Sequence, residues 1–139
     1  MRTSTPGLLA ALALAGAAGA APASHRHPPI DRSGRAQVGA ASYYARSMTG
    51  AETASGKTLK ASRMTAASKT LPLGTRAKVT DLDTGKSVRV TVTDRGPYAR
   101  HRILDVSRKA AAKLGMKRHG VAKVRVQPLK EPPAASGAK

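Results

Sequence analysis

The sequence contains no cysteine, no phenylalanine and no tryptophan. Because cysteine is absent, the chain can form no disulfide bond, thiol nucleophile or zinc–thiolate site. We also expect that it is not a lipoprotein and has no membrane anchor, since a diacylglycerol group would need a cysteine. The core must be built from Val, Leu, Ile, Met and Ala, and the only aromatic residues are Tyr43, Tyr44 and Tyr98.

Acidic residues are also scarce. Seven Asp and Glu stand against 25 Lys and Arg, which gives a net charge of +18. A positive electrostatic potential favours polyanionic partners, and we expect the protein to bind anionic polymers of the cell envelope. Charge alone would also fit nucleic acid, but we predict no nucleic-acid partner because aromatic stacking surfaces are lacking and because we expect the chain to be exported. A chain of 139 residues has room for one small domain, which we expect to be a monomer.

The two ends of the chain differ in composition from its middle. Residues 1–23 have the positive start, short apolar run and small cleavage residues of a secretory signal peptide, so we expect export to the periplasm or the cell wall. Residues 24–36 form a Pro-rich, charged linker, and residues 128–139 form a disordered Pro/Ala tail. The folded domain is predicted to span residues 37–127.

Within this domain, six short segments alternate or cluster apolar residues in the way that strands do. They are residues 37–44, 64–68, 76–81, 87–93, 102–106 and 121–127. One short helix is predicted to follow Ser107 as N-cap and to end at Gly115. Gly85 lies in the turn of a hairpin between the third and fourth strands. Many short strands with one short helix indicate a mainly β, barrel-like fold.

Asp94 is the strongest candidate for acid–base chemistry. It follows Val88, Val90 and Val92 on one face of a predicted strand, where Gly96-Pro97 ends the ladder. The other six carboxylates have structural explanations. Asp31 lies in the linker and Glu131 in the tail, while Asp81 and Asp83 flank a turn. Asp105 is expected to pair with Arg102 or to cap the helix, and Glu52 is expected to be solvated on the loop 45–60. From the residues alone, Asp94 is equally a strand-end turn residue or a site residue.

Several segments together resemble the rare lipoprotein A (RlpA)-like family, and the resemblance covers residues 37–127. The segments, in order, are GAASYY (39–44), TASG (53–56), MTAA (64–67), LPLG (71–74), VTDL (79–82), DRGPY (94–98), RILDVS (102–107) and AAAKLG (110–115). The resemblance implies a six-stranded double-psi β-barrel with one short helix.

The same resemblance implies a function in cell wall organisation. Family members are identified as endolytic peptidoglycan transglycosylases, lyases that cleave the MurNAc–GlcNAc bond of glycan strands and leave 1,6-anhydro-MurNAc. Asp94 occupies the position of the family's catalytic Asp, and no metal or cofactor is expected. The residues expected to contact the glycan are Tyr43, Tyr44, Ser55, Lys57, Ser68, Arg95 and Tyr98.

Two positions depart from the family pattern. Active members commonly have Glu where this chain has Lys57, and His where it has Ser68. Neither replacement can accept and donate protons at neutral pH as the expected residue does. The alternative is therefore a catalytically inactive, expansin-like module that binds peptidoglycan or loosens the wall.

Overall fold

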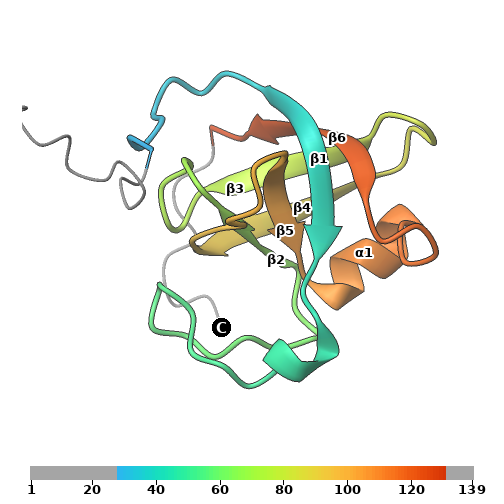
Figure 1. The fold of residues 1–139 in the computed structure, drawn as a ribbon. Helices are drawn as coiled ribbons and strands as arrows, with labels where there is room; N and C mark the ends of the chain where they lie inside the picture. Colours follow the sequence, from blue (N-terminus) through green and yellow to red (C-terminus); the bar gives the residue numbers. More distant parts are fainter. Residues whose placement is uncertain (1–27, 131–139) are drawn as a thin grey trace, which may run out of the picture.

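The computed structural model of the chain describes residues 28–130 (Figure 1). The predicted signal peptide, the start of the predicted linker and residues 131–139 lie outside the described residues, so those predictions remain predictions. The elements are β1 (Gln37–Tyr43), a 3-10 turn (Arg46–Met48), β2 (Thr65–Ser68), β3 (Arg76–Asp81), β4 (Ser87–Asp94), β5 (Arg102–Val106), α1 (Arg108–Leu114) and β6 (Ala122–Pro128).

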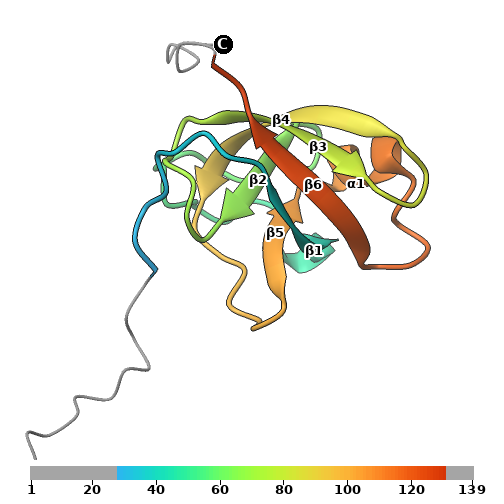
Figure 2. The ribbon, with the colours of Figure 1, turned by 90° about the horizontal axis from the view of Figure 1, so that it is seen from above.

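The six strands close into a barrel in the order β1-β5-β2-β4-β3-β6 (Figures 1 and 2). The pairs β1–β5 and β2–β4 are parallel, and the other four pairs are antiparallel. The register shifts once in each parallel pair, after Ala40 in β1 and after Ala66 in β2. The mainly β, barrel-like fold with one short helix is thus confirmed.

The core lies inside the barrel, where the alternating valines predict it. Val88, Val90 and Val92 of β4 are buried and pack in one cluster with residues such as Leu104 of β5 and Leu114 of α1. Each fully buried Val or Leu contributes about 1.5–3 kcal/mol to folding. Aliphatic side chains, alanine and methionine fill this core without Phe or Trp.

The predicted boundaries agree with the observed ones to within one residue at each end. Ser107 caps α1, because its side chain accepts a hydrogen bond from the Ala110 N–H, and Gly115 ends it with φ +75°. The hairpin turn between β3 and β4 has its positive φ at Gly85, as predicted. The strand β4 extends one residue beyond the prediction, so Asp94 is its last residue.

One glycine explains how closely β1 and β5 approach each other. An ideal Cβ built at Gly39 would lie only 2.9 Å from Cγ2 of Ile103. Because the contacting atom belongs to a β-branched side chain with restricted rotamers, it could not easily move aside. The absence of a side chain at Gly39 therefore allows β1 and β5 to pack this closely.

The segments that flank the barrel contact it at specific points. The Asp31 N–H donates to the Thr70 carbonyl at 2.8 Å, so the described end of the predicted linker touches the β2–β3 connection. At the other end, the Leu129 N–H donates to the Arg76 carbonyl at 2.8 Å and continues the pairing of β6 with β3. No helix in residues 28–130 has the length and apolar character needed to cross a membrane.

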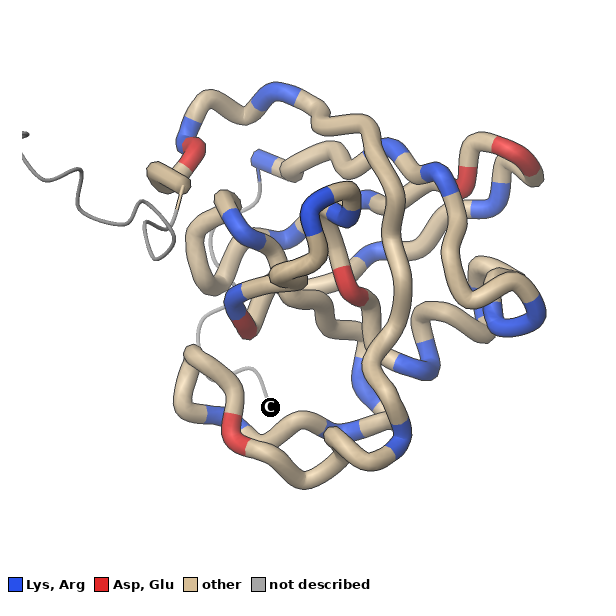
Figure 3. The backbone as a smooth tube through the Cα atoms, in the orientation of Figure 1, with Lys and Arg blue, Asp and Glu red and all other residues tan. Residues whose placement is uncertain are grey.

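The charges are distributed very unevenly by sign. Lys and Arg occur on strands, loops and helix alike, whereas Asp and Glu occupy a few separate places (Figure 3). A carboxylate in this protein therefore lies in a strongly positive field, and the positions of the few acids narrow the search for a site.

Candidate active site

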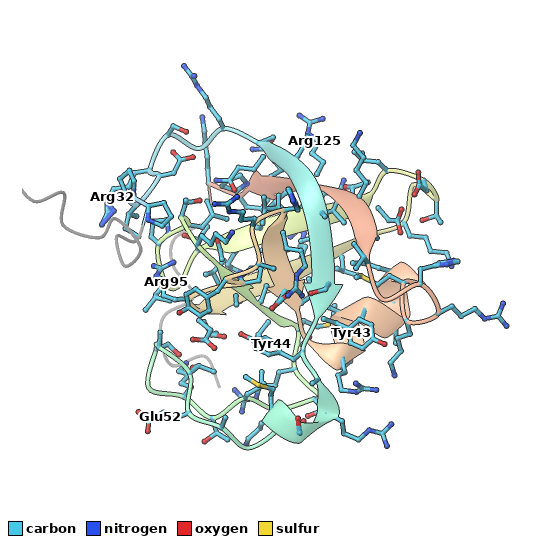
Figure 4. All side chains as sticks on the ribbon, viewed as in Figure 1. Arg32, Tyr43, Tyr44, Glu52, Arg95 and Arg125 are labelled. Atoms are coloured by element: carbon cyan, nitrogen blue, oxygen red, sulfur yellow. The ribbon has the colours of Figure 1, made fainter. Side chains whose placement is uncertain are left out.

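A cleft of about 550 Å³ opens beside the end of β4. Residues from the end of β1, the loop after β4 and the strand β5 line it, and five of them were predicted from the sequence: Tyr43, Tyr44, Asp94, Arg95 and Tyr98. Figure 4 shows Tyr43 and Tyr44 at the lower end of β1, with Arg95 farther to the left. The barrel thus brings residues 43–44 and 94–98 to one place.

The carboxylate of Asp94 is held by three hydrogen-bond donors. The Tyr44 hydroxyl donates to Oδ2 at 2.9 Å, and the backbone N–H groups of Ala54 and Arg95 donate to Oδ1 at 2.9 Å each. Hydrogen bonds to an ionised acceptor are shorter and stronger than neutral ones. The three donors therefore stabilise the carboxylate and fix its orientation in the cleft.

The Ala54 donor is positioned by a tight loop that the sequence did not predict in this place. The Thr53 N–H and hydroxyl both donate to the Lys57 carbonyl, at 2.8 and 2.7 Å, and Gly56 adopts φ +86°. The Ser55 N–H donates to the Thr93 carbonyl at 3.0 Å, which attaches the loop to the end of β4. This attachment directs the Ala54 N–H toward the Asp94 carboxylate.

Tyr44 acts as a permanent donor to Asp94. Its side chain is only 7% exposed, in a small cluster with Leu59 and Ala67. Burial raises the pKa of the Tyr44 phenol, and the hydrogen bond to Asp94 raises it further. The phenol consequently remains protonated at physiological pH.

Arg95 has a structural role that sequence reasoning missed. Its Nη1 donates to the Ser68 carbonyl at 2.9 Å and to the Leu71 carbonyl at 2.6 Å. These bonds satisfy one carbonyl at the end of β2 and one in the β2–β3 connection, and they hold both against the end of β4. Arg95 lines the cleft, but part of its hydrogen-bonding capacity is used inside the protein.

The two other tyrosines form different parts of the cleft wall. Tyr98 is 74% exposed, so its ring offers an amphipathic aromatic surface to a ligand. The hydroxyl of Tyr43 donates to the Lys117 carbonyl at 3.1 Å, and the Arg108 guanidinium lies 5.3 Å from the centre of its ring. Tyr43 is therefore held in place by α1 and the segment that follows it.

A second carboxylate, Asp105, lines the same cleft. Its Oδ1 lies 3.2 Å from Nη1 of Arg102, and the Ser42 hydroxyl is hydrogen-bonded to both side chains. The predicted pairing with Arg102 is confirmed, and capping of α1 falls to Ser107 instead. No sequence pattern indicates that Asp105 lies at the cleft, because its position depends on how β1, β5 and β2 are ordered in the barrel.

Three predicted glycan-contacting residues do not line the cleft. Ser68 is 1% exposed, and its hydroxyl accepts hydrogen bonds from the N–H groups of Thr70 and Leu71 at 3.2 and 3.0 Å. Ser55 and Lys57 line a separate pocket. Glu52 is exposed on the same loop and points outward, away from Tyr44, in agreement with its predicted solvation (Figure 4).

The cleft brings together groups that can transfer a proton to or from a bound ligand. One carboxylate is oriented by fixed donors, an aromatic ring is exposed at the rim, and the paired Asp105 and Arg102 supply further polar groups. Within residues 28–130, no three His, Asp or Glu side chains come together in a way that could hold a metal ion.

Comparison with known proteins agrees with this geometry. A family model described as lytic transglycolase matches residues 36–126. The probable endolytic peptidoglycan transglycosylase RlpA of Treponema pallidum is 51% identical over 88 residues, which cover 63% of this chain and 28% of that protein. The endolytic peptidoglycan transglycosylase RlpA of Pseudomonas aeruginosa is 46% identical over 101 residues, covering 73% and 30%.

The chain spans less than a third of the length of these two relatives. Among solved structures, an expansin of Clavibacter michiganensis aligns with a TM-score of 0.56 and 26% identity, over 70% of this chain and 52% of that one. The similarity thus covers the barrel. It includes proteins that are named transglycosylases and a protein that is named an expansin.

Proposed function

The chain belongs to the RlpA-like lytic transglycosylase family of double-psi β-barrels, and on this premise we propose that it is an endolytic peptidoglycan transglycosylase. The proposed reaction cleaves the MurNAc–GlcNAc bond of a glycan strand and leaves 1,6-anhydro-MurNAc. The protein would act in cell wall organisation outside the cytoplasm, with peptidoglycan glycan strands as its partner and substrate.

The observation that carries this proposal is the placement of Asp94. Its carboxylate lies in the cleft and accepts hydrogen bonds from Tyr44, Ala54 and Arg95. A side chain fixed in this way can transfer a proton repeatedly to and from a bound ligand in one geometry. Tyr98 at the rim would then provide a surface on which a sugar ring can lie.

Asp94 would act first as an acid and then as a base. It protonates the glycosidic oxygen, and the bond from that oxygen to the muramyl C1 breaks. The resulting carboxylate then accepts the proton of the muramyl C6 hydroxyl while O6 forms a bond to C1. One proton is given and one is taken, and no water is consumed. The three donors stabilise the carboxylate at the stage between these two steps.

We further propose that Lys57 and Ser68 stand where active relatives have Glu and His. The hydroxyl of Ser68 is buried and bonded to backbone N–H groups, and Lys57 lines the neighbouring pocket. Neither residue offers a second proton-transfer group to the cleft. Asp94 would therefore carry out both proton transfers without these helpers, at a lower rate than in relatives that have them.

A second candidate function follows from the same two residues. A non-catalytic, expansin-like module could bind peptidoglycan in this cleft, or loosen the wall, without breaking glycan bonds. The absence of a second proton-transfer group at positions 57 and 68 favours it, and so does the structural similarity to an expansin.

An assay with purified sacculi separates the two candidates. The protein, its Asp94→Asn variant and a control Asp83→Asn variant are incubated with sacculi, and the released fragments are analysed by mass spectrometry. Asp83 is exposed in the β3–β4 turn, so its variant controls for the loss of a carboxylate. We expect anhydro-muropeptides from the wild type and the control, and a reduction of about 100-fold or more in Asp94→Asn.

Each other outcome has a distinct meaning. If the wild-type protein bound sacculi without releasing anhydro-muropeptides, the proposed enzymatic activity would be overturned and the binding-module function would remain. Equal release by Asp94→Asn would overturn the role of Asp94 while the activity stands.

A further inference from the structure

A second pocket, of about 460 Å³, lies next to the cleft. Its walls come from the segment 55–65, the strands β3 and β4, and the start of α1. Thr93 lines this pocket and Asp94 lines the cleft, so the end of β4 separates the two. The proposed reaction makes no use of this pocket.

The lining of the pocket is strongly basic. Six cationic side chains contribute to it, and none of the described residues that line it is Asp or Glu. The six are Lys57, Lys60, Arg63, Arg76, Arg89 and Lys109. Arg76 and Arg89 also interact within the protein. The positive charges of the other four, Lys57, Lys60, Arg63 and Lys109, focus a positive potential into the hollow, which an anionic ligand would offset.

The donors also surround the pocket from several directions. Lys57, Lys60 and Arg63 come from the loop, Arg76 and Arg89 from the sheet, and Lys109 from the helix. A carboxylate is planar and has two oxygens, whereas a phosphate is tetrahedral and can accept bonds on more sides. Arg and Lys, together with Ser and Thr hydroxyls, are the usual phosphate ligands in proteins.

We propose that this pocket binds phosphate groups of an anionic polymer. The site is separate from the glycan cleft, and the binding does not depend on the proposed transglycosylase activity. Because the pocket adjoins the end of β4, a polymer bound there lies beside the cleft and would hold the protein close to the material on which the cleft acts.

The test measures binding of inorganic polyphosphate to the purified protein by isothermal titration calorimetry at low salt. The pocket variant is Lys60→Gln/Arg63→Gln, and the matched control is Lys117→Gln/Arg118→Gln. All four side chains are exposed, and each pair removes two positive charges, so thermal melting should show both variants folded. We expect the pocket variant to bind about tenfold or more weakly and the control to change less than about twofold.

Nuclear magnetic resonance identifies where on the protein phosphate binds. Titration with inorganic phosphate should shift the backbone amides of Ser62, Arg63 and Thr91, which line the pocket, more than those of Tyr44 and Tyr98 in the cleft. Rising salt should weaken the binding, because it screens the charges involved.

Three results would overturn the proposal. Equal losses in the pocket variant and the control would show that binding follows net charge alone. Equal or tighter binding of poly-L-glutamate would assign the pocket to carboxylates instead of phosphates. If polyphosphate did not bind the wild-type protein, the pocket would not be a phosphate-binding site. A short single-stranded oligonucleotide, tested in parallel, distinguishes nucleic acid from other sources of phosphate.

Discussion

Tyr44 and Asp94 lie 50 residues apart in the sequence and are joined by a hydrogen bond of 2.9 Å from the phenol to Oδ2. The bond connects the end of β1 to the end of β4, two strands that are not neighbours in the barrel. Because Tyr44 is buried and its phenol remains protonated, the acid has one fixed donor beneath it. This contact couples the stability of the barrel to the geometry of the cleft.

Replacement of Tyr44 by Phe should therefore reduce stability and disturb the cleft. Removal of a hydrogen bond to a partly exposed carboxylate should lower the free energy of unfolding by about 1–2 kcal/mol, measured by urea denaturation. Tyr43→Phe is the matched control, since its hydroxyl bonds to an exposed backbone carbonyl, and it should cost about 0.5 kcal/mol. Equal stability of Tyr44→Phe and the wild type would contradict the assigned bond.

The raised pKa of Tyr44 predicts a specific loss of stability at high pH. Above pH about 10 the unfolded phenol loses its proton, while the folded phenol keeps it. The unfolded state then binds fewer protons, so the free energy of unfolding falls as pH rises. The advantage of the wild type over Tyr44→Phe should shrink above this pH, by up to about 1.4 kcal/mol per pH unit. A constant difference between pH 8 and 12 would contradict the prediction.

Arg95 should matter for stability as well as for any ligand. Arg95→Ala leaves the carbonyls of Ser68 and Leu71 without their donor, and both residues are almost fully buried. We expect a loss of about 2–4 kcal/mol in the free energy of unfolding. Arg100→Ala, at an exposed position in the same loop, should change it by less than about 0.5 kcal/mol. Similar free energies of unfolding for the two variants would show that the hydrogen bonds of Arg95 do not stabilise the fold.

Gly39 gives a test of the close approach of β1 and β5. Gly39→Ala should destabilise the protein by about 1–3 kcal/mol, because the new Cβ would crowd Ile103. In an Ile103→Ala background the same change should cost about 1 kcal/mol less, since the crowded atoms are gone. Additive effects of the two substitutions, measured by chemical denaturation, would exclude this contact as the cause.

Local patterns in the sequence predict most of the fold. The alternation of Val88, Val90 and Val92 locates β4, and Ser107 with Gly115 bounds α1, because each signal depends on residues within one element. The tight turn at Gly85 is predictable for the same reason. The short 3-10 turn at Arg46–Met48 was missed, since that loop has no apolar period and no capping side chain.

The site was less predictable, because its contacts join distant parts of the chain. The donation from Ala54 to Asp94 spans 40 residues and depends on how the loop folds onto β4. Asp105 reaches the same cleft only through the order of the strands in the barrel. Ser68, expected to contact glycan, instead has a buried hydroxyl that is bonded to the following turn.

The proposed reaction requires Asp94 to transfer protons while the muramyl O6 attacks C1 of the same sugar. The most direct measurement is the mass and end chemistry of the fragments that the wild-type protein releases from purified sacculi. We expect fragments that end in 1,6-anhydro-MurNAc, that disappear with Asp94→Asn and that Asp83→Asn still releases. Fragments with hydrated reducing ends, or no fragments from the wild type, would contradict it.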